Sequence, residues 1–318
     1  RDRSVSRGLG DVYKRQEIKP DSLHAWILAA RPKTLTGAII PVSIGSSLAF
    51  ADGSFEITLA LLCALFACGM QIAANFINDL YDYLKGSDRE DRLGPERACA
   101  QGWITPGAMK RGIGSMLIFS CLMGCAILYS CWGQLPHGGW ELILLGVLCV
   151  VFAFLYTTVL SYRGWGDLLV LVFFGFIPVG GTYYVQAHTL TSDVWVASLI
   201  CGLVIDTLLV VNNYRDREQD ALSGKRTLIV RFGEAFGSYL YLGLGIVATL
   251  LCLWFVFSEK MNSFTFIVAP YVYLYFHILT WRKMLKIRSG KKLNSILGET
   301  SRNMLLFGLL LTVVLAVS

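Results

Sequence analysis

Carboxylate and amide side chains recur at helical spacing in one short stretch of the sequence. Asn75, Asn78, Asp79 and Asp82 stand at i, i+3, i+4 and i+7, so a helix with 3.6 residues per turn places them on one face. Oxygen atoms of this kind bind Mg²⁺, which is usually held by one or two carboxylates together with substrate phosphates. The spacing therefore predicts a helix face that can hold a metal-bound phosphate.

A second stretch repeats this pattern. Asn212, Asp216 and Asp220 stand at i, i+4 and i+8, and the basic pair Lys225 and Arg226 follows. Carboxylates that converge at the C-terminal ends of helices repel one another and meet the negative end of the helix dipole, so they need cations. Two such faces at one end of a helical bundle predict a metal-bridged diphosphate. Solvated helix ends are the alternative, which is less favoured because such groups near hydrocarbon cost free energy without partners.

The elements that must position these groups are membrane-spanning helices. Apolar side chains make up 55% of the 318 residues and charged ones only 16%, whereas a soluble domain carries about 25% charged residues. Apolar runs long enough to cross a bilayer recur along the chain, so we predict an all-α, polytopic membrane bundle and not a soluble enzyme. Its nine expected transmembrane helices are residues 34–50, 59–82, 112–131, 141–160, 167–187, 194–214, 236–258, 264–281 and 302–318.

Basic residues mark one side of this predicted bundle. If successive connections alternate between the two sides, 27 of the 28 Lys and Arg residues fall on one side and only Lys260 on the other. Positive charge collects on the cytoplasmic side of membrane proteins, so we expect a cytoplasmic N-terminus. Both acidic stretches reach this side, which predicts an active site at the cytoplasmic interface. The net charge of +6 thus reports topology, and nucleic acid is not an expected partner.

A single membrane domain is expected over residues 17–318. Residues 1–16 lack apolar periodicity and resemble a translated linker sequence, so we set them apart from it. The nine cysteines contain no CxxC pair and most lie inside the expected helices. We interpret them as small packing residues and expect neither a disulfide framework nor a cysteine metal site.

Several motifs, in order along the chain, resemble those of the UbiA-type superfamily of intramembrane aromatic prenyltransferases. Members of this superfamily resemble one another in having nine helices and two Asp-rich motifs. Within it, the sequence resembles the branch that prenylates 1,4-dihydroxy-2-naphthoate in menaquinone biosynthesis. The resemblance covers about residues 22–318. One departure from the superfamily pattern is that the third Asp of the first motif falls at Gly86, with Asp88 two residues later. The matching stretches are residues 30–35, 78–88, 91–95, 162–167, 186–190, 212–216 and 224–228.

This resemblance implies a Mg²⁺-dependent enzyme of the cell (plasma or inner) membrane. It would transfer a polyprenyl chain from polyprenyl diphosphate to 1,4-dihydroxy-2-naphthoate, with loss of CO₂ and diphosphate. Catalysis would centre on Asp82, Asp216 and Asp220, and Asp79 would either ligate metal or orient the ligands. The implied metal ligands are Asn78, Asp79, Asp82, Asp88, Asp216 and Asp220.

The same resemblance suggests substrate-binding residues near the cytoplasmic interface. Lys85, Arg89, Arg92, Lys225 and Arg226 are candidates to neutralise the phosphates, although the positive-inside rule alone also explains such residues. Arg31, Lys33, Arg163 and Asp167 are candidates to bind the aromatic acceptor, and Arg31 and Lys33 read equally well as snorkelling anchors. Tyr156 could shield an allylic cation. Asn212 and Asn213 are the remaining candidates for substrate binding. Asp206 is a lone acid deeper in its helix, for which a hydrogen bond to a polar neighbour is the plainer account.

Two other functions remain open at this point. Prenylation of another aromatic acceptor, such as 4-hydroxybenzoate or homogentisate, would use the same acidic motifs. A cation-coupled membrane transporter is the alternative from a different class. Transporter sites lie near the bilayer midplane on interrupted helices, whereas these acids gather at one interface, and this favours the enzyme.

Overall fold

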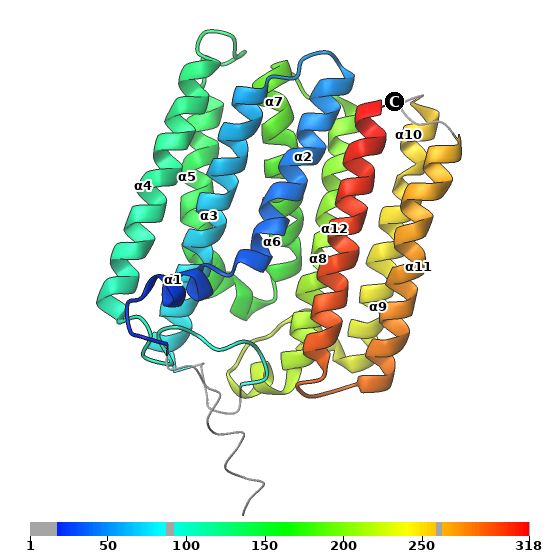
Figure 1. Cartoon of the computed structure of the whole chain (residues 1–318). Coiled ribbons are helices and arrows are strands. Elements are labelled where there is room, and N and C mark those ends of the chain that lie inside the picture. The colour runs from blue at the N-terminus through cyan, green and yellow to red at the C-terminus, as the bar shows by residue number, and fades with distance from the viewer. Residues whose placement is uncertain (1–17, 87–91, 259–262, 318) are drawn as a thin grey trace, which may run out of the picture.

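The computed structural model describes residues 18–86, 92–258 and 263–317, which form a bundle of roughly parallel and antiparallel helices (Figure 1). The predicted segment boundary at residue 16 lies outside the described residues. The helices of the first half are α1 (Leu23–Ala30), η2 (Pro32–Leu35), α2 (Thr36–Ala51), α3 (Ile57–Leu84), α4 (Pro106–Ser130), α5 (Trp140–Leu155), η3 (Tyr156–Leu160) and η4 (Ser161–Arg163). Those of the second half are α6 (Gly166–Val170), η5 (Leu171–Gly180), α7 (Gly181–Ala187), α8 (Ser192–Leu222), α9 (Leu228–Leu251), α10 (Leu253–Phe257), α11 (Ser263–Ile287) and α12 (Leu293–Val317).

The prediction of an all-helical membrane bundle is confirmed. Within the described ranges, 8 helical stretches are long and apolar enough to cross a membrane. The expected span 264–281 lies within α11, a helix of 25 residues that is not one of these eight, so nine spans stays a prediction. Several helices run past the apolar runs, because polar caps start them early: Thr105 accepts a hydrogen bond from the Ala108 amide and Thr227 from the Val230 amide.

The centre of the bundle is α8, which has the largest buried share of the eight stretches. It packs against η5, α9 and α12, and α2 packs against η5, α12 and α8 itself. Small residues allow these close approaches. A Cβ added at Gly45 on α2 would stand 2.5 Å from the Val179 carbonyl oxygen, and one at Gly175 would stand 2.5 Å from the Ser198 carbonyl oxygen. Packing through small residues is the usual way that membrane helices come together.

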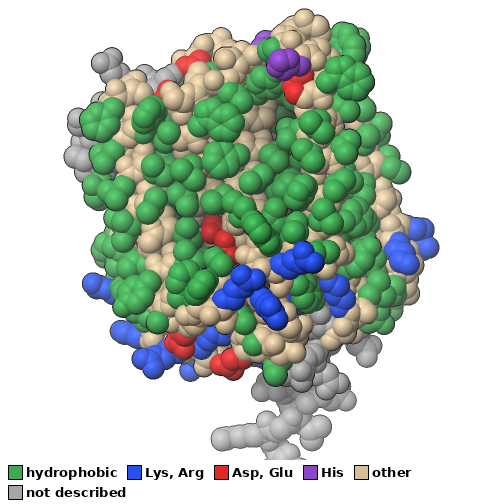
Figure 2. All heavy atoms as spheres, turned by 180° about the vertical axis from the view of Figure 1, so that it is seen from behind, with side chains coloured by type: hydrophobic (Ala, Val, Ile, Leu, Met, Phe, Trp, Pro, Cys, Tyr) green, Lys and Arg blue, Asp and Glu red, His purple; other side chains and the backbone are tan. Residues whose placement is uncertain are grey.

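The outer surface is an apolar belt with charge at one end. Figure 2 shows hydrophobic side chains over most of one face, with Lys and Arg gathered toward its lower edge. Large side chains such as Leu61, Ile118 and Leu144 are more than half exposed, which suits contact with lipid. The C-terminal ends of α3 and α8 and the start of α4 lie together at this lower end (Figure 1). The fold therefore brings the two acidic stretches to the charged end of the bundle.

Candidate active site

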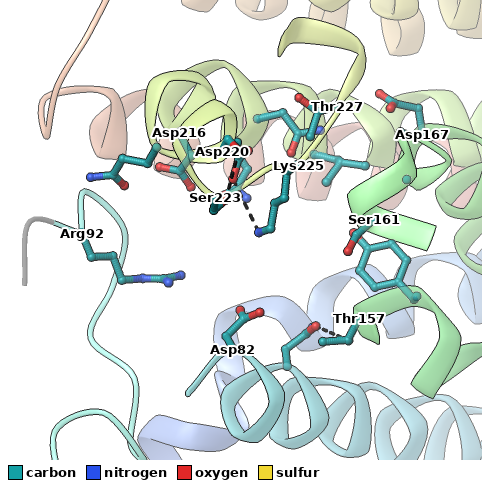
Figure 3. Close-up of a pocket in the computed structure, with 18 of the residues that line it drawn as sticks. Asp82, Arg92, Thr157, Ser161, Asp167, Asp216, Asp220, Ser223, Lys225 and Thr227 are labelled. Carbon is teal, nitrogen blue, oxygen red and sulfur yellow. Dashed lines mark hydrogen bonds and ion pairs between the residues drawn. The ribbon is translucent and has the colours of Figure 1, made fainter. Parts of the chain in front are cut away.

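The two acidic helix ends face each other across a polar pocket at the lower end of the bundle. Figure 3 shows Asp82 on one wall and Asp216 and Asp220 on the opposite wall. The cavity has a volume of about 190 Å³. Its walls come from the C-terminal ends of α3 and α8, from η3, η4 and the start of α6, and from the connections after α1, α3, η4 and α8. The lining residues are Arg31, Asn78, Asp82, Arg92, Arg97, Tyr156, Thr157, Ser161, Gly164, Gly166, Asp167, Leu209, Asn212, Asn213, Asp216, Gln219, Asp220, Ser223, Lys225 and Thr227.

On α3, the predicted acidic face divides between the pocket and two neighbouring segments. Asn78 and Asp82 line the pocket, and Asn78 accepts a hydrogen bond from the Thr157 hydroxyl of η3. Asn75 instead donates to the Ala30 carbonyl and the Thr34 hydroxyl, both at 2.9 Å. One predicted stripe therefore performs two tasks: its last turn faces the cavity, and its first turn fastens α1 and η2 to the bundle.

Asp79 does not line the pocket. Its two carboxylate oxygens accept the backbone amides of Ala98 and Cys99, at 2.9 and 2.8 Å, and the residue is 1% exposed. Both carboxylate oxygens thus hold backbone, so the contacts of Asp79 are structural, and its role toward a metal stays a prediction. Asp79 fixes the connection between α3 and α4, from which Arg92 and Arg97 reach the cavity.

Asp82, Asp216 and Asp220 each have a basic partner. Asp82 accepts from Arg97 at 2.8 Å, and Asp220 lies 3.5 Å from the Lys225 ammonium. Asp216 pairs with its chain neighbour Arg215 at 2.5 Å. Burial lowers the pKa of Lys225, but the nearby carboxylates of Asp220 and Asp82 more than offset this, so its pKa lies above the usual range. Lys225 is therefore a cation at neutral pH, directed into the cavity (Figure 3).

Arg97 is the functional residue that the sequence reasoning missed most clearly. From the sequence it is only one of the basic residues that indicate topology, whereas the structure shows it 7% exposed and bonded to Asp82. A signal was present, because Arg97 follows a charged stretch that is longer than a simple connector needs. Thr157, Ser161, Gln219, Ser223 and Thr227 are further lining residues that the sequence analysis did not select.

The η3 segment carries Tyr156 and Thr157 and is a π-helix. Short π-helical insertions concentrate at functional sites because they redirect side chains within an otherwise regular helix. Here the segment turns Tyr156 and Thr157 toward Asn78 and Asp82. Helical periodicity in the sequence carried no sign of this irregularity.

The structure divides the predicted substrate-binding residues into two groups. Arg31, Arg92, Tyr156, Asn212, Asn213 and Lys225 line the cavity, as does Asp167. Lys33, Arg163 and Arg226 are exposed and do not line it. Asp88 and Arg89 lie outside the described residues.

Lys85 is also absent from the cavity wall, because its ammonium is used elsewhere. It donates to the carbonyls of Thr157 and Thr158, at 3.3 and 2.8 Å, and lies 4.0 Å from the centre of the Tyr162 ring. Partial burial lowers its pKa, and the nearby Asp82 carboxylate offsets only part of this effect. The structure gives Lys85 the task of joining the end of α3 to η3 and η4.

Asp206 lies beneath the pocket on α8, three residues before the lining residue Leu209. It is 2% exposed, and its Oδ1 atom has no hydrogen-bond partner among the described residues. The expected hydrogen bond to a polar neighbour is therefore not found for this oxygen. Asp206 remains a buried acid below the site without a structural explanation.

The donor set fits magnesium and not a metal held by protein alone. In the described part of the chain, no three His, Cys, Asp or Glu residues are close enough together to hold a metal ion. Mg²⁺ needs only one or two carboxylates when phosphate oxygens and water complete its octahedral shell. Asp82 with Asn78 on one wall, and Asp216 with Asp220 on the other, supply oxygen donors of this kind.

Comparison with known proteins gives consistent matches along the chain. The model of the UbiA prenyltransferase family matches residues 38–307. The chain is 38% identical over 233 residues to 1,4-dihydroxy-2-naphthoate octaprenyltransferase of Escherichia coli K12, covering 72% of this chain and 75% of that protein. It is 32% identical over 294 residues to the protein of the same name from Mycobacterium tuberculosis, covering 91% and 95%.

Solved structures share the fold at low sequence identity. A UbiA homolog from Archaeoglobus fulgidus bound to DMAPP and Mg²⁺ has a TM-score of 0.63 and 14% identity, covering 92% of this chain and 100% of that one. A UbiA homolog from Aeropyrum pernix K1 without ligand has a TM-score of 0.64 and 16% identity, covering 87% and 97%. At these identities the likeness concerns the fold alone.

Proposed function

The chain belongs to the UbiA prenyltransferase family, and we propose that it transfers a polyprenyl chain from its diphosphate to 1,4-dihydroxy-2-naphthoate. The observation that carries this proposal is the pocket in which Asp82 from α3 faces Asp216 and Asp220 from α8 (Figure 3). The acceptor follows from the relatives named above, which are 32–38% identical to this chain. We place the pocket at the cytoplasmic face of the cell membrane, where the basic connections gather.

The diphosphate would lie between the two acidic walls, with Mg²⁺ as cofactor. When bound, Mg²⁺ would supply the charge that neutralises diphosphate as it leaves. The chain's own cations add to this effect, since Arg92 and Lys225 both line the cavity. Preorganised positive groups around a leaving phosphate lower the barrier, because they need no rearrangement when the charge develops.

The reaction replaces a carboxylate on the ring by a prenyl group. The bond between the allylic carbon and the diphosphate oxygen breaks, and its electron pair leaves on the diphosphate. The ring carbon then bonds to the allylic carbon, and its carboxylate departs as CO₂, which returns an electron pair to the ring. The aromatic face of Tyr156 can stabilise positive charge on the allylic carbon. Arg31 is the cationic lining residue that we assign to the acceptor's carboxylate before it leaves.

A transporter is not favoured by this architecture. The acidic residues stand at the ends of α3 and α8 and not at mid-membrane breaks in helices, where transporter sites lie. The proposal therefore concerns an enzyme whose lipid substrate reaches the site from the bilayer.

Purified protein in detergent tests the proposal directly. Octaprenyl diphosphate and Mg²⁺ are supplied with 1,4-dihydroxy-2-naphthoate, 4-hydroxybenzoate or homogentisate in parallel reactions, and the prenylated product and CO₂ are measured. We expect turnover with dihydroxynaphthoate, its loss when EDTA removes the metal, and its return with added Mg²⁺. Turnover of hydroxybenzoate alone would replace the proposed acceptor, and full activity in EDTA would remove the proposed metal.

A further inference from the structure

Arg215 is a buried cation that binds the pocket carboxylate of Asp216 from outside the cavity. Its Nε and Nη2 atoms donate to the two oxygens of Asp216, at 2.7 and 2.5 Å, and Nη2 also donates to Asn212 at 2.8 Å. Arg215 is 3% exposed and, unlike Asp216 and Asn212, does not line the cavity. Two parallel bonds fix the plane of a carboxylate, while each oxygen keeps a further lone pair that can face the pocket.

The same guanidinium reaches the opposite side of the site. Its Nη1 atom donates to the Asn294 side chain of α12 at 2.8 Å, and Asn294 donates to the Leu93 carbonyl at 2.8 Å. The next residue, Gly94, lies so close that an added Cβ would stand 2.9 Å from Nη2 of Arg215. One side chain therefore joins α8 and α12 to the connection that follows α3.

That connection belongs to the other wall of the pocket. It supplies Arg92, which lines the cavity, and Arg97, which pairs with Asp82. Holding residues 92–95 against α8 therefore also sets the distance between Asp82 and Asp216. The flat fork of an arginine can serve Asp216, Asn212 and Asn294 at once, whereas a lysine ammonium is a point charge without that geometry.

We propose that Arg215 is a positioning residue that aligns Asp216 for the metal-bound diphosphate and keeps the two acidic walls of the pocket in register. The alignment of Asp216 rests on the proposed function, while the docking of residues 92–95 does not. An ion pair that only stabilised the fold would require neither the alignment of Asp216 nor the docking of residues 92–95. Measuring these two effects therefore distinguishes the proposal from a purely stabilising role.

Arg217 offers a matched control on the same helix. It donates to the carbonyls of Tyr214 and Arg288, at 2.7 and 3.0 Å, and to Glu234 at 3.1 Å. These contacts hold α8 to α9 and to the connection before α12, but they involve neither the pocket carboxylates nor residues 92–95. Arg217→Lys thus removes a comparable arginine network outside the site.

The first measurement is metal binding without prenyl transfer. Mn²⁺ with inorganic diphosphate is titrated into detergent-purified wild type, Arg215→Lys and Arg217→Lys, and free Mn²⁺ is followed by electron paramagnetic resonance. Residues that orient metal ligands typically change metal affinity 10–100-fold, so we expect a loss of about that size for Arg215→Lys and less than twofold for Arg217→Lys.

The second measurement is tryptic cleavage after Arg92. We expect cleavage about tenfold faster in Arg215→Lys and in Asn294→Ala, because both break the link to Leu93, and an unchanged rate in Arg217→Lys. A variant that combines Arg215→Lys with Asn294→Ala should be cleaved no faster than the faster of the two single variants, since two changes in one network are not additive. If Arg215→Lys does not fold, Asn294→Ala still carries this test.

Four outcomes would overturn the proposal in whole or in part. Mn²⁺ affinity of Arg215→Lys within twofold of wild type would remove its role in aligning Asp216, and unchanged cleavage in both variants would remove its role in docking. Equal losses in Arg217→Lys would mean general destabilisation. If the wild type binds no Mn²⁺, both the proposed metal site and the role of Arg215 in aligning Asp216 for that metal would be wrong. A wild type that shows the expected pattern but prenylates no aromatic acid would overturn the proposed function alone.

Discussion

Replacing Asp79 should separate a structural acid from a catalytic one within the same motif. Its carboxylate accepts the buried amides of Ala98 and Cys99. Asp79→Ala leaves both N–H groups without a partner in a site that water cannot reach. A buried, unsatisfied polar group costs about 1–3 kcal/mol, so we expect unfolding free energy to fall by about 2–6 kcal/mol. Asp79→Asn keeps one acceptor oxygen and should lose about half as much.

The assay is unfolding by SDS in mixed micelles, followed by far-ultraviolet circular dichroism. Glu96→Gln is the control, because Glu96 is an exposed carboxylate in the same connection, and we expect its unfolding curve to match wild type. Residual activity of each variant is measured at a temperature where that variant remains folded. We expect Asp79→Asn to keep the Mg²⁺ concentration for half-maximal activity within about threefold of wild type.

The reasoning would be refuted by the opposite pattern. If Asp79→Asn and Asp79→Ala unfold like wild type but need far more Mg²⁺, Asp79 is a metal ligand and its bonds to the α3–α4 connection carry little energy. Such a result would restore the simpler interpretation of the motif, in which every acid of the helix end holds metal.

Three further predictions concern the pocket and its support. Asp82→Asn and Asp216→Asn should each lower kcat/KM by at least about 100-fold while the protein still inserts and folds; product formation measures this, and near-normal turnover in either would remove that residue from the site. Lys225→Gln should lower kcat about tenfold with a smaller change in the KM for polyprenyl diphosphate, because its charge stabilises the diphosphate most as negative charge develops on it; steady-state kinetics would contradict this if only KM rose. Gly45→Ala forces a methyl group against the Val179 carbonyl and should cost about 1–3 kcal/mol of stability, and an unchanged SDS unfolding midpoint would count against this packing.

Much of the helical framework was predictable because membrane helices obey simple length and polarity requirements. The expected helix 59–82 is α3 at Ile57–Leu84, and the expected helix 167–187 closely matches the stretch Gly166–Ala187. The errors lie at the ends. The expected helix 194–214 continues to Leu222 in α8, because hydropathy ends where the hydrocarbon ends, whereas a helix can continue into the polar interface.

The sequence by itself determined which residues stand at the ends of α3 and α8. Hydropathy set where each helix crosses the apolar layer, and the period of 3.6 put Asn78, Asp79 and Asp82 on one broad face. Identifying these oxygen-rich faces as the walls of one site required only that both helices end on the same side of the membrane.

Only the tertiary structure decided what each member of a stripe contacts. Successive helical residues are rotated by about 100°, so a face that holds Asn78, Asp79 and Asp82 is wide enough to touch two neighbours. Asp79 binds the backbone of the α3–α4 connection, whereas Asp82 lines the cavity. Arg97 reached its partner in the same way, because folding of the connection, which helical periodicity does not encode, brought its guanidinium group to Asp82. Arg215 pairs with its chain neighbour Asp216, and only long-range packing added Asn294 of α12 as a further partner.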